Sequence, residues 1–160
     1  MTTKADFTDE EWARLVRAPV VAGMAISLAD PGGPIEAIKE TTATMKSAME
    51  PPQAEGQAEL VDEVAKSFAE QVRQRQRPLG DFKPRGALAG EQILDELRAV
   101  NELVTEKASP DEAAAFRDWL LTAARRSSEA AKEGGFMGFN AERVSKGERE
   151  MLDKLGEVLS

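Results

Sequence analysis

Apolar side chains recur at intervals of three and four residues along most of this 160-residue chain, and its prolines and glycines stand mostly between the periodic segments. Such spacing collects apolar side chains on one face of an α-helix, because a helix turns once every ~3.6 residues. A chain of this length fits one domain and buries roughly 70% of the surface that its unfolded form exposes. We therefore predict an all-α fold, an irregular bundle of about six helices, as a single helical domain over residues 1–160.

Short motifs predict where three of the helices begin. Each places a Ser or Thr three residues before a Glu, the pattern of a capping box, in which each side chain accepts a hydrogen bond from the other residue's backbone amide. The motifs span Thr8–Glu11, Ser109–Glu112 and Ser145–Glu148. The second also has Pro110 at the first helical position, where a missing amide costs nothing.

The segment that follows Thr8 is apolar around nearly its whole circumference as far as Leu28, which is typical of the central helix of a bundle. Pro19 removes one backbone amide, so we expect a kink there. The longest apolar stretch, Ala18 to Ala29, is about half as long as a membrane-spanning helix needs. We expect this stretch to be buried inside the protein, and we expect no contact with a membrane.

A break at Asp30–Pro34 separates this helix from a second one, which we expect to run to about Glu50. Its apolar positions follow one another at three- and four-residue intervals, so they predict one apolar seam along the helix. The seam consists of Ile35, Ile38, Thr42, Met45 and Met49.

Apolar faces of the same kind predict the remaining helices, over residues 53–76, from about 93 to 108, over 109–134 and from 145 onward. Residues 77–90 are rich in proline and glycine, and we expect them to form a crossing loop between two helical halves. We expect residues 1–7 to form a disordered tail.

Charge and composition exclude several classes of function. The formal net charge of −8 comes from 21 basic and 29 acidic residues and repels phosphate backbones, so we expect no nucleic-acid partner. The chain contains no His, Cys or Tyr, which excludes serine–histidine and cysteine–histidine catalysis, histidine-ligated haem and ordinary zinc sites. We therefore predict a protein that is not an enzyme. The polar N-terminus, unlike a secretory signal, predicts a cytoplasmic location.

A glycine-rich segment before the last helix carries large apolar side chains, which loops seldom need. Phe136 and Phe139 stand there among glycines, and Arg143 follows. One interpretation is a binding loop in which the rings grip a protein partner and Arg143 adds a charge. The alternative is that both rings close the open end of the bundle, which the rarity of exposed aromatic patches on monomers favours.

Acidic and amide side chains lie near the two glycine-rich breaks and offer oxygen ligands to a hard cation such as Ca²⁺ or Mg²⁺. The alternative is that they act as helix caps and solvated carboxylates, because their spacing is not that of a calcium loop. These residues are Asp30, Glu36, Asn140, Glu142 and Glu148.

Two stretches resemble a known family. Asp30–Glu36, after a helix of small apolar residues, and Arg143–Glu148, which opens a later helix, are similar to segments of the TerB tellurite-resistance family. The resemblance implies a compact all-helical fold and a cation-binding role for the acidic turn residues. The string from Ala131 to Phe139 also resembles the tail of small uncharacterised bacterial helical-bundle proteins, to which no activity is attached.

These observations favour a non-catalytic interaction or stress-response module that contacts an unknown protein partner through Phe136, Phe139 and Arg143. A second hypothesis is a TerB-like cation-binding protein without another cofactor, with Asp30, Glu36, Asn140 or Glu142 as ligands. A third is an enzyme that uses carboxylate or lysine chemistry.

Overall fold

The computed structural model describes residues 2–29, 34–52, 59–132 and 146–160, with the backbone alone at 34–37, 131 and 132. Over these ranges the chain forms α-helices, two short 3₁₀ turns and no strand, which confirms the predicted all-α fold. The elements are η1 (Lys4–Asp6), α1 (Asp9–Ala29), α2 (Pro34–Met49), α3 (Glu59–Arg73), η2 (Gly86–Leu88), α4 (Ala89–Lys107), α5 (Pro110–Lys132) and α6 (Lys146–Val158).

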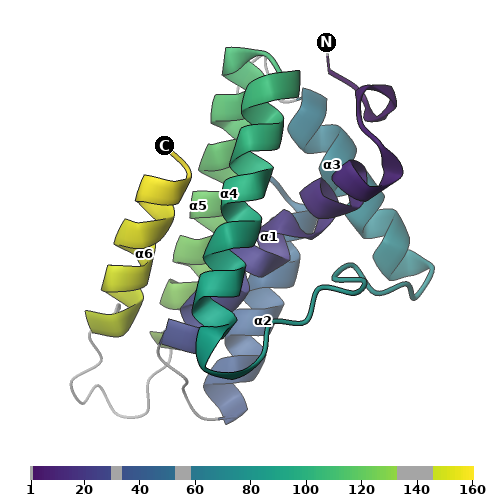
Figure 1. Ribbon diagram of the computed structural model, residues 1–160. Helices are drawn as coiled ribbons and strands as arrows, with labels where there is room; N and C mark the ends of the chain where they lie inside the picture. The colour runs from purple at the N-terminus through teal and green to yellow at the C-terminus, as the bar shows by residue number, and fades with distance from the viewer. Residues whose placement is uncertain (1, 30–33, 53–58, 133–145) are drawn as a thin grey trace.

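Helix α1 is the central helix of the bundle, as its sequence predicts. It contacts each of the other five α-helices of the described chain, and α4 and α5 stand side by side with α6 along one flank (Figure 1). Most of its residues from Leu15 to Ile26 are buried. By length and composition α1 is the one described helix that would also suffice to cross a membrane. Its packing against every neighbouring helix explains its apolar composition without a membrane.

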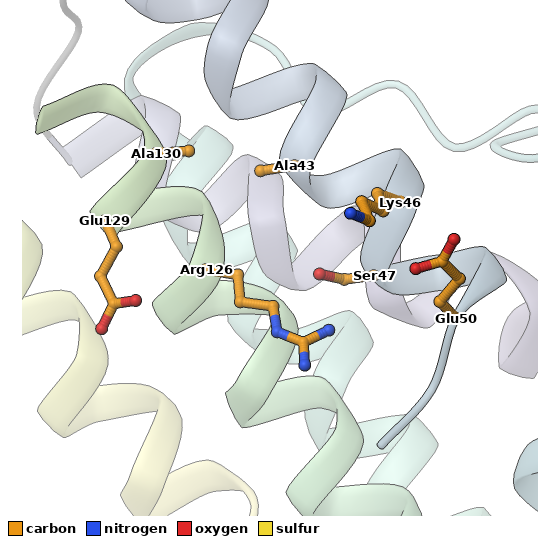
Figure 2. Close-up of a pocket in the computed structure, with 7 residues that line it drawn as sticks. All are labelled: Ala43, Lys46, Ser47, Glu50, Arg126, Glu129 and Ala130. Carbon is orange, nitrogen blue, oxygen red and sulfur yellow. The ribbon is translucent and has the colours of Figure 1, made fainter. Parts of the chain in front are cut away.

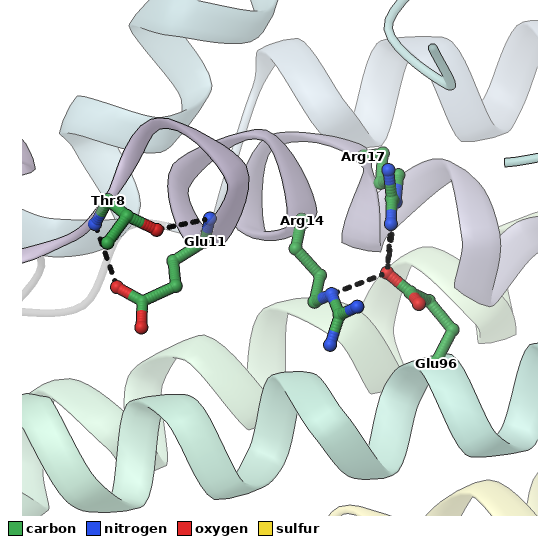
Figure 3. Close-up of polar contacts among 5 residues, drawn as sticks. All are labelled: Thr8, Glu11, Arg14, Arg17 and Glu96. Carbon is green, nitrogen blue, oxygen red and sulfur yellow. Dashed lines mark hydrogen bonds and ion pairs between the residues drawn. The ribbon is translucent and has the colours of Figure 1, made fainter. Parts of the chain in front are cut away.

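Two of the predicted capping boxes form. The Glu11 amide donates to Thr8 Oγ1 at 3.2 Å, and the Thr8 amide donates to the Glu11 carboxylate at 2.8 Å (Figure 3). Ser109 and Glu112 exchange the same two bonds at the start of α5, at 3.1 and 3.2 Å. The third box begins at Ser145, which lies outside the described residues.

An ion pair joins α1 to α4. Arg17 donates from Nε and Nη2 to one oxygen of Glu96, at 2.9 and 2.7 Å, and Arg14 lies 3.4 Å from the same oxygen (Figure 3). Glu96 is largely buried, so the two guanidinium groups compensate a charge that has lost most of its hydration. Arg17 also lies over the Phe82 ring, 5.2 Å from its centroid, and so holds the irregular connection between α3 and α4 against α1.

The seam predicted for α2 is wrong. Ile38 is 67% exposed, Met49 is 41% exposed and Thr42 is exposed, while Met45 is only partly buried. The side chain of Ile35 lies outside the described set. The buried face of α2 carries Glu40, Thr44, Ser47 and Ala48 instead.

Close contact with α1 explains why α2 turns this small and polar face inward. A Cβ added at Gly23 would lie 2.3 Å from Thr44 Oγ1 and 2.9 Å from Thr44 Cβ, so the two helices touch at a point where α1 has no side chain. The long side chains of Ile38 and Met49 do not suit such a close approach, whereas Thr44, Ser47 and Ala48 do.

The N-terminal residues also differ from the expected disordered tail, because residues 2–7 pack on the bundle. Thr2 is buried and bonds Glu112 through both its amide, at 3.1 Å, and its hydroxyl. The centroid of the Phe7 ring lies 5.7 Å from that of the Trp12 ring. The Lys107 ammonium lies over the Phe7 ring, also 5.7 Å from its centroid. Glu112 and Lys107 lie far from these residues in the sequence, so no local pattern predicts the two contacts.

The Gly23–Thr44 contact predicts opposite effects of the same change at two helical glycines. Gly23→Ala should destabilise the protein, because overpacking costs about 1–3 kcal/mol and exceeds the gain of up to about 1 kcal/mol that alanine brings to a helix. Gly156→Ala, where nothing lies within 4 Å of the added Cβ, should stabilise it. Urea denaturation measures both, and equal stabilisation by the two variants would contradict the close contact.

The Thr2–Glu112 contact predicts a dependence of stability on pH. Burial raises the pKa of the Glu112 carboxyl, but hydrogen bonds from Thr2 and Ser109 outweigh burial and hold that pKa below its usual value of 4.5. A depressed pKa in the folded state stabilises the protein above the unfolded pKa, and this stabilisation is lost as pH falls through the folded pKa.

Glu112→Gln should therefore flatten the fall in the free energy of unfolding below about pH 4.5, because glutamine takes up no proton. Thr2→Val, which removes only the hydroxyl donor, should flatten it less. Urea midpoints measured across this pH range give the slopes. If the free energy of unfolding falls equally steeply with pH in the parent and in Glu112→Gln, the Glu112 carboxyl does not contribute to the pH dependence of stability.

Candidate functional site

The site residues predicted from the sequence lie outside the described part of the chain. Phe136, Phe139, Asn140, Glu142 and Arg143 belong to residues 133–145, and Asp30 belongs to residues 30–33. Glu36 lies in the first turn of α2, where only the backbone is described. The structure therefore neither brings these side chains together nor separates them.

The helix ends that flank both segments meet at one end of the bundle. The end of α1, the beginning of α2, the end of α5 and the beginning of α6 lie at the lower end in Figure 1. A Cβ added at Gly147 would lie 2.7 Å from the Ala29 carbonyl oxygen, so the start of α6 touches the end of α1. The ends of α1 and α5 and the beginnings of α2 and α6 thus lie at the same end of the fold.

Two buried glutamates lie near this end, each bonded to a serine of the preceding helix in the fold. Ser27 of α1 donates to Glu40 of α2, and Ser128 of α5 donates to Glu148 of α6. Glu40 is 2% exposed and Glu148 is 1% exposed. The predicted capping role of Glu148 involves Ser145, which lies outside the described residues, and the structure shows that Glu148 also contacts the neighbouring helix α5.

One side of helix α2, which we call the α2 stripe, carries Ile38, Thr42, Met45 and Met49. Ile38, Thr42 and Met49 are exposed, and Met45 is partly buried against the core. The members of the stripe follow at intervals of four, three and four residues and span about three helical turns. The stripe has the periodicity of a buried helix face, but Ile38 and Met49 rank among the exposed large apolar side chains of the described chain. It is the clearest candidate contact surface in the structure.

A groove of about 340 Å³ lies between α2 and α5, beside the α2 stripe (Figure 2). We call it the α2–α5 groove. Lys46, Ser47 and Glu50 line it from α2, and Arg126 and Glu129 line it from α5, with alanines from each helix. Ser47 forms its floor, because this residue is 1% exposed. The backbone there is held in place by Trp119, whose Nε1 donates to the Ser47 carbonyl oxygen at 2.7 Å.

Sequence reasoning missed both α2 features because it assigned the apolar positions of α2 to the core. One signal was available for the groove: Lys46 and Glu50, and likewise Arg126 and Glu129, have spacings at which helices form ion pairs. Neither pair forms an ion pair in the described structure, since the ion pairs found there join other residues.

The described residues contain no group of three or more acidic side chains close enough to hold a metal ion. In comparisons with protein families, curated proteins and solved structures, none matches this chain. The likeness to the TerB family therefore stays a prediction from the sequence.

Proposed function

We propose that this protein is a non-catalytic interaction module and that the α2 stripe docks on a partner protein. The observation that carries the proposal is the orientation of α2, which exposes Ile38 and Met49 and buries Glu40 and Ser47. While Ile38 and Met49 face water, these two side chains add little to the stability of the fold. Fully burying an Ile or Met side chain is worth about 1.5–3 kcal/mol, so a partner that covers the stripe gains binding energy from it.

The charges beside the stripe suggest the chemistry of the partner. Lys46 is exposed and follows the stripe along the edge that faces the α2–α5 groove. An amphipathic helix with an apolar face bordered by carboxylates would match this edge.

A second contact surface remains proposed at Phe136, Phe139 and Arg143, where the sequence predicts a binding loop. A role in stress response is supported by the resemblance to the TerB family. Both surfaces belong to the same proposed function, and mutations in each surface separately measure its contribution to partner binding.

We expect Ile38→Glu to weaken association with the partner while leaving the melting temperature nearly unchanged, because exposed substitutions usually change stability by less than about 0.5 kcal/mol. Leu88→Glu is the matched control, since Leu88 is 60% exposed but lies in η2 and not in α2. Quantitative affinity purification from the native host compares the parent with both variants. A protein captured by the parent and by Leu88→Glu but lost with Ile38→Glu is the expected result.

The variants Phe136→Ala and Phe139→Ala test the second surface in the same experiment. Loss of the same protein with little change in melting temperature places these rings in the contact. A large loss of stability, about 3–5 kcal/mol for each truncation, would instead assign them to the core. If every variant captures what the parent captures, or if the parent associates only with itself in light scattering, a partner on the α2 stripe is excluded.

A second candidate function is binding of a hard cation, and the buried carboxylates of Glu40 and Glu148 favour it. Both lie on the helices that follow the segments carrying Asp30, Asn140 and Glu142. Carboxylate and amide oxygens are the ligands that Ca²⁺ and Mg²⁺ prefer, so the residue types fit such an ion. Among the described residues no three acidic side chains come close enough together to hold such an ion, so the proposal depends on residues of the two undescribed segments.

If a cation binds the native state, Ca²⁺ or Mg²⁺ should raise the melting temperature beyond the effect of KCl at equal ionic strength. Glu40→Gln and Glu148→Gln should abolish that increase, because an amide loses the charge but keeps the size of the side chain. The comparison is the ion-dependent shift within each variant, so a change in baseline stability does not affect it. Absence of a shift with either ion in the parent excludes this function.

A further inference from the structure

We propose that the α2–α5 groove is a binding site for a small phosphorylated molecule, with Lys46 and Arg126 as the charged ligands of the phosphoryl group and the Ser47 hydroxyl as a third donor. The site is distinct from the α2 stripe, which faces solvent on the other side of Lys46. The proposed occupant of the groove is a small molecule, whereas the proposed occupant of the α2 stripe is a partner protein.

The Ser47 hydroxyl is the first observation. Ser47 is 1% exposed, and its Oγ is one of two buried side-chain atoms without a hydrogen-bond partner among the described residues. A buried hydroxyl left unpaired costs about 1–3 kcal/mol, so such a group calls for an explanation. In Figure 2 its oxygen lies toward the groove and the side of Arg126. A ligand oxygen at the floor of the groove would accept its proton.

The two cations are the second observation. Each stands one helical turn from a glutamate on its own helix, Lys46 before Glu50 and Arg126 before Glu129, yet neither forms an ion pair in the described structure. Figure 2 shows the Lys46 ammonium and the Arg126 guanidinium leaning into the space between α2 and α5, while Glu129 turns away from it. The cations therefore converge from facing helices.

The chemistry of these groups matches a phosphoryl group. Arginine, lysine and an unpaired serine hydroxyl are all hydrogen-bond donors, and a phosphate offers only acceptors. A groove of about 340 Å³ falls within the usual size of small-molecule sites. The charges of Glu50 and Glu129 balance those of the two cations, so attraction of a phosphoryl group depends on hydrogen-bond donors that point at it. Together with the net charge of −8, this balance disfavours a nucleic acid as the ligand.

The two tryptophans of the chain provide a test with an internal control. The Trp119 indole donates to the Ser47 carbonyl at the floor of the groove, whereas the Trp12 indole donates to Ser67 between α1 and α3. Titration of ¹⁵N-labelled protein with inorganic phosphate at constant ionic strength should shift the Trp119 indole resonance in a saturable way and leave that of Trp12 unchanged.

Variants assign the effect to the proposed groups. Arg126→Gln and Lys46→Gln should each weaken phosphate binding about tenfold or more, as expected for loss of a charge-assisted hydrogen bond, and Ser47→Ala about fivefold. Arg98→Gln is the matched control, because Arg98 is exposed on α4 and pairs with Asp95. It should bind phosphate as the parent does.

Several outcomes would overturn the proposal. Parallel, unsaturated shifts of both indoles would show a general salt effect, which phosphate exerts on many proteins by exclusion from the surface. Unchanged binding by Arg126→Gln would remove the groove as the site. Equal or stronger saturation by acetate would show that the groove recognises a carboxylate and not a phosphoryl group.

Discussion

The close approach of α1 and α2 at Gly23 and Thr44 is the constraint on which the rest of this structure depends. Because α1 has no side chain at Gly23, α2 lies against it through small and polar residues. The orientation of α2 follows from that contact, since a helix that buries Thr44 and Ser47 must turn Ile38 and Met49 toward water. Both candidate surfaces of the described chain, the α2 stripe and the α2–α5 groove, result from this one contact between α1 and α2.

Buried polar groups are the second consequence of small-residue packing. Glu40 and Glu148 are both held by a serine of the neighbouring helix, Ser27 and Ser128, so the same contact occurs in the α1–α2 unit and in the α5–α6 unit. Such groups are tolerated in a core only where hydrogen bonds replace water. Glu40 and Glu148 lie near the end of the bundle whose helix ends flank the acidic residues that the sequence predicts as cation ligands.

The two surfaces share a single helix, and Lys46 borders both. A partner on the α2 stripe and a small ligand in the groove would each interact with this side chain, so the two proposed sites are physically coupled through it. Helix α2 packs against α1, α3 and α5, and within the α2 stripe Met45 packs against the core, whereas Ile38 and Met49 stay exposed. That division leaves Ile38 and Met49 available for recognition, which suits an interaction module better than a helix whose apolar side chains are all used in folding.

Local patterns in the sequence determined the helices. The capping boxes at Thr8 and Ser109 form as predicted, and the apolar circumference of α1 places it at the centre, because these signals involve residues within one or two turns of each other. Only the tertiary structure decided which face of α2 is buried and that Thr2 is anchored by Glu112, 110 residues away. Either of two faces of α2 could be buried when the helix is considered alone, and the contact with Gly23 of α1 determines which one is. The predicted site residues near Phe136 and Asp30 lie outside the described chain, whereas the groove around Ser47 exists only because distant helices meet there.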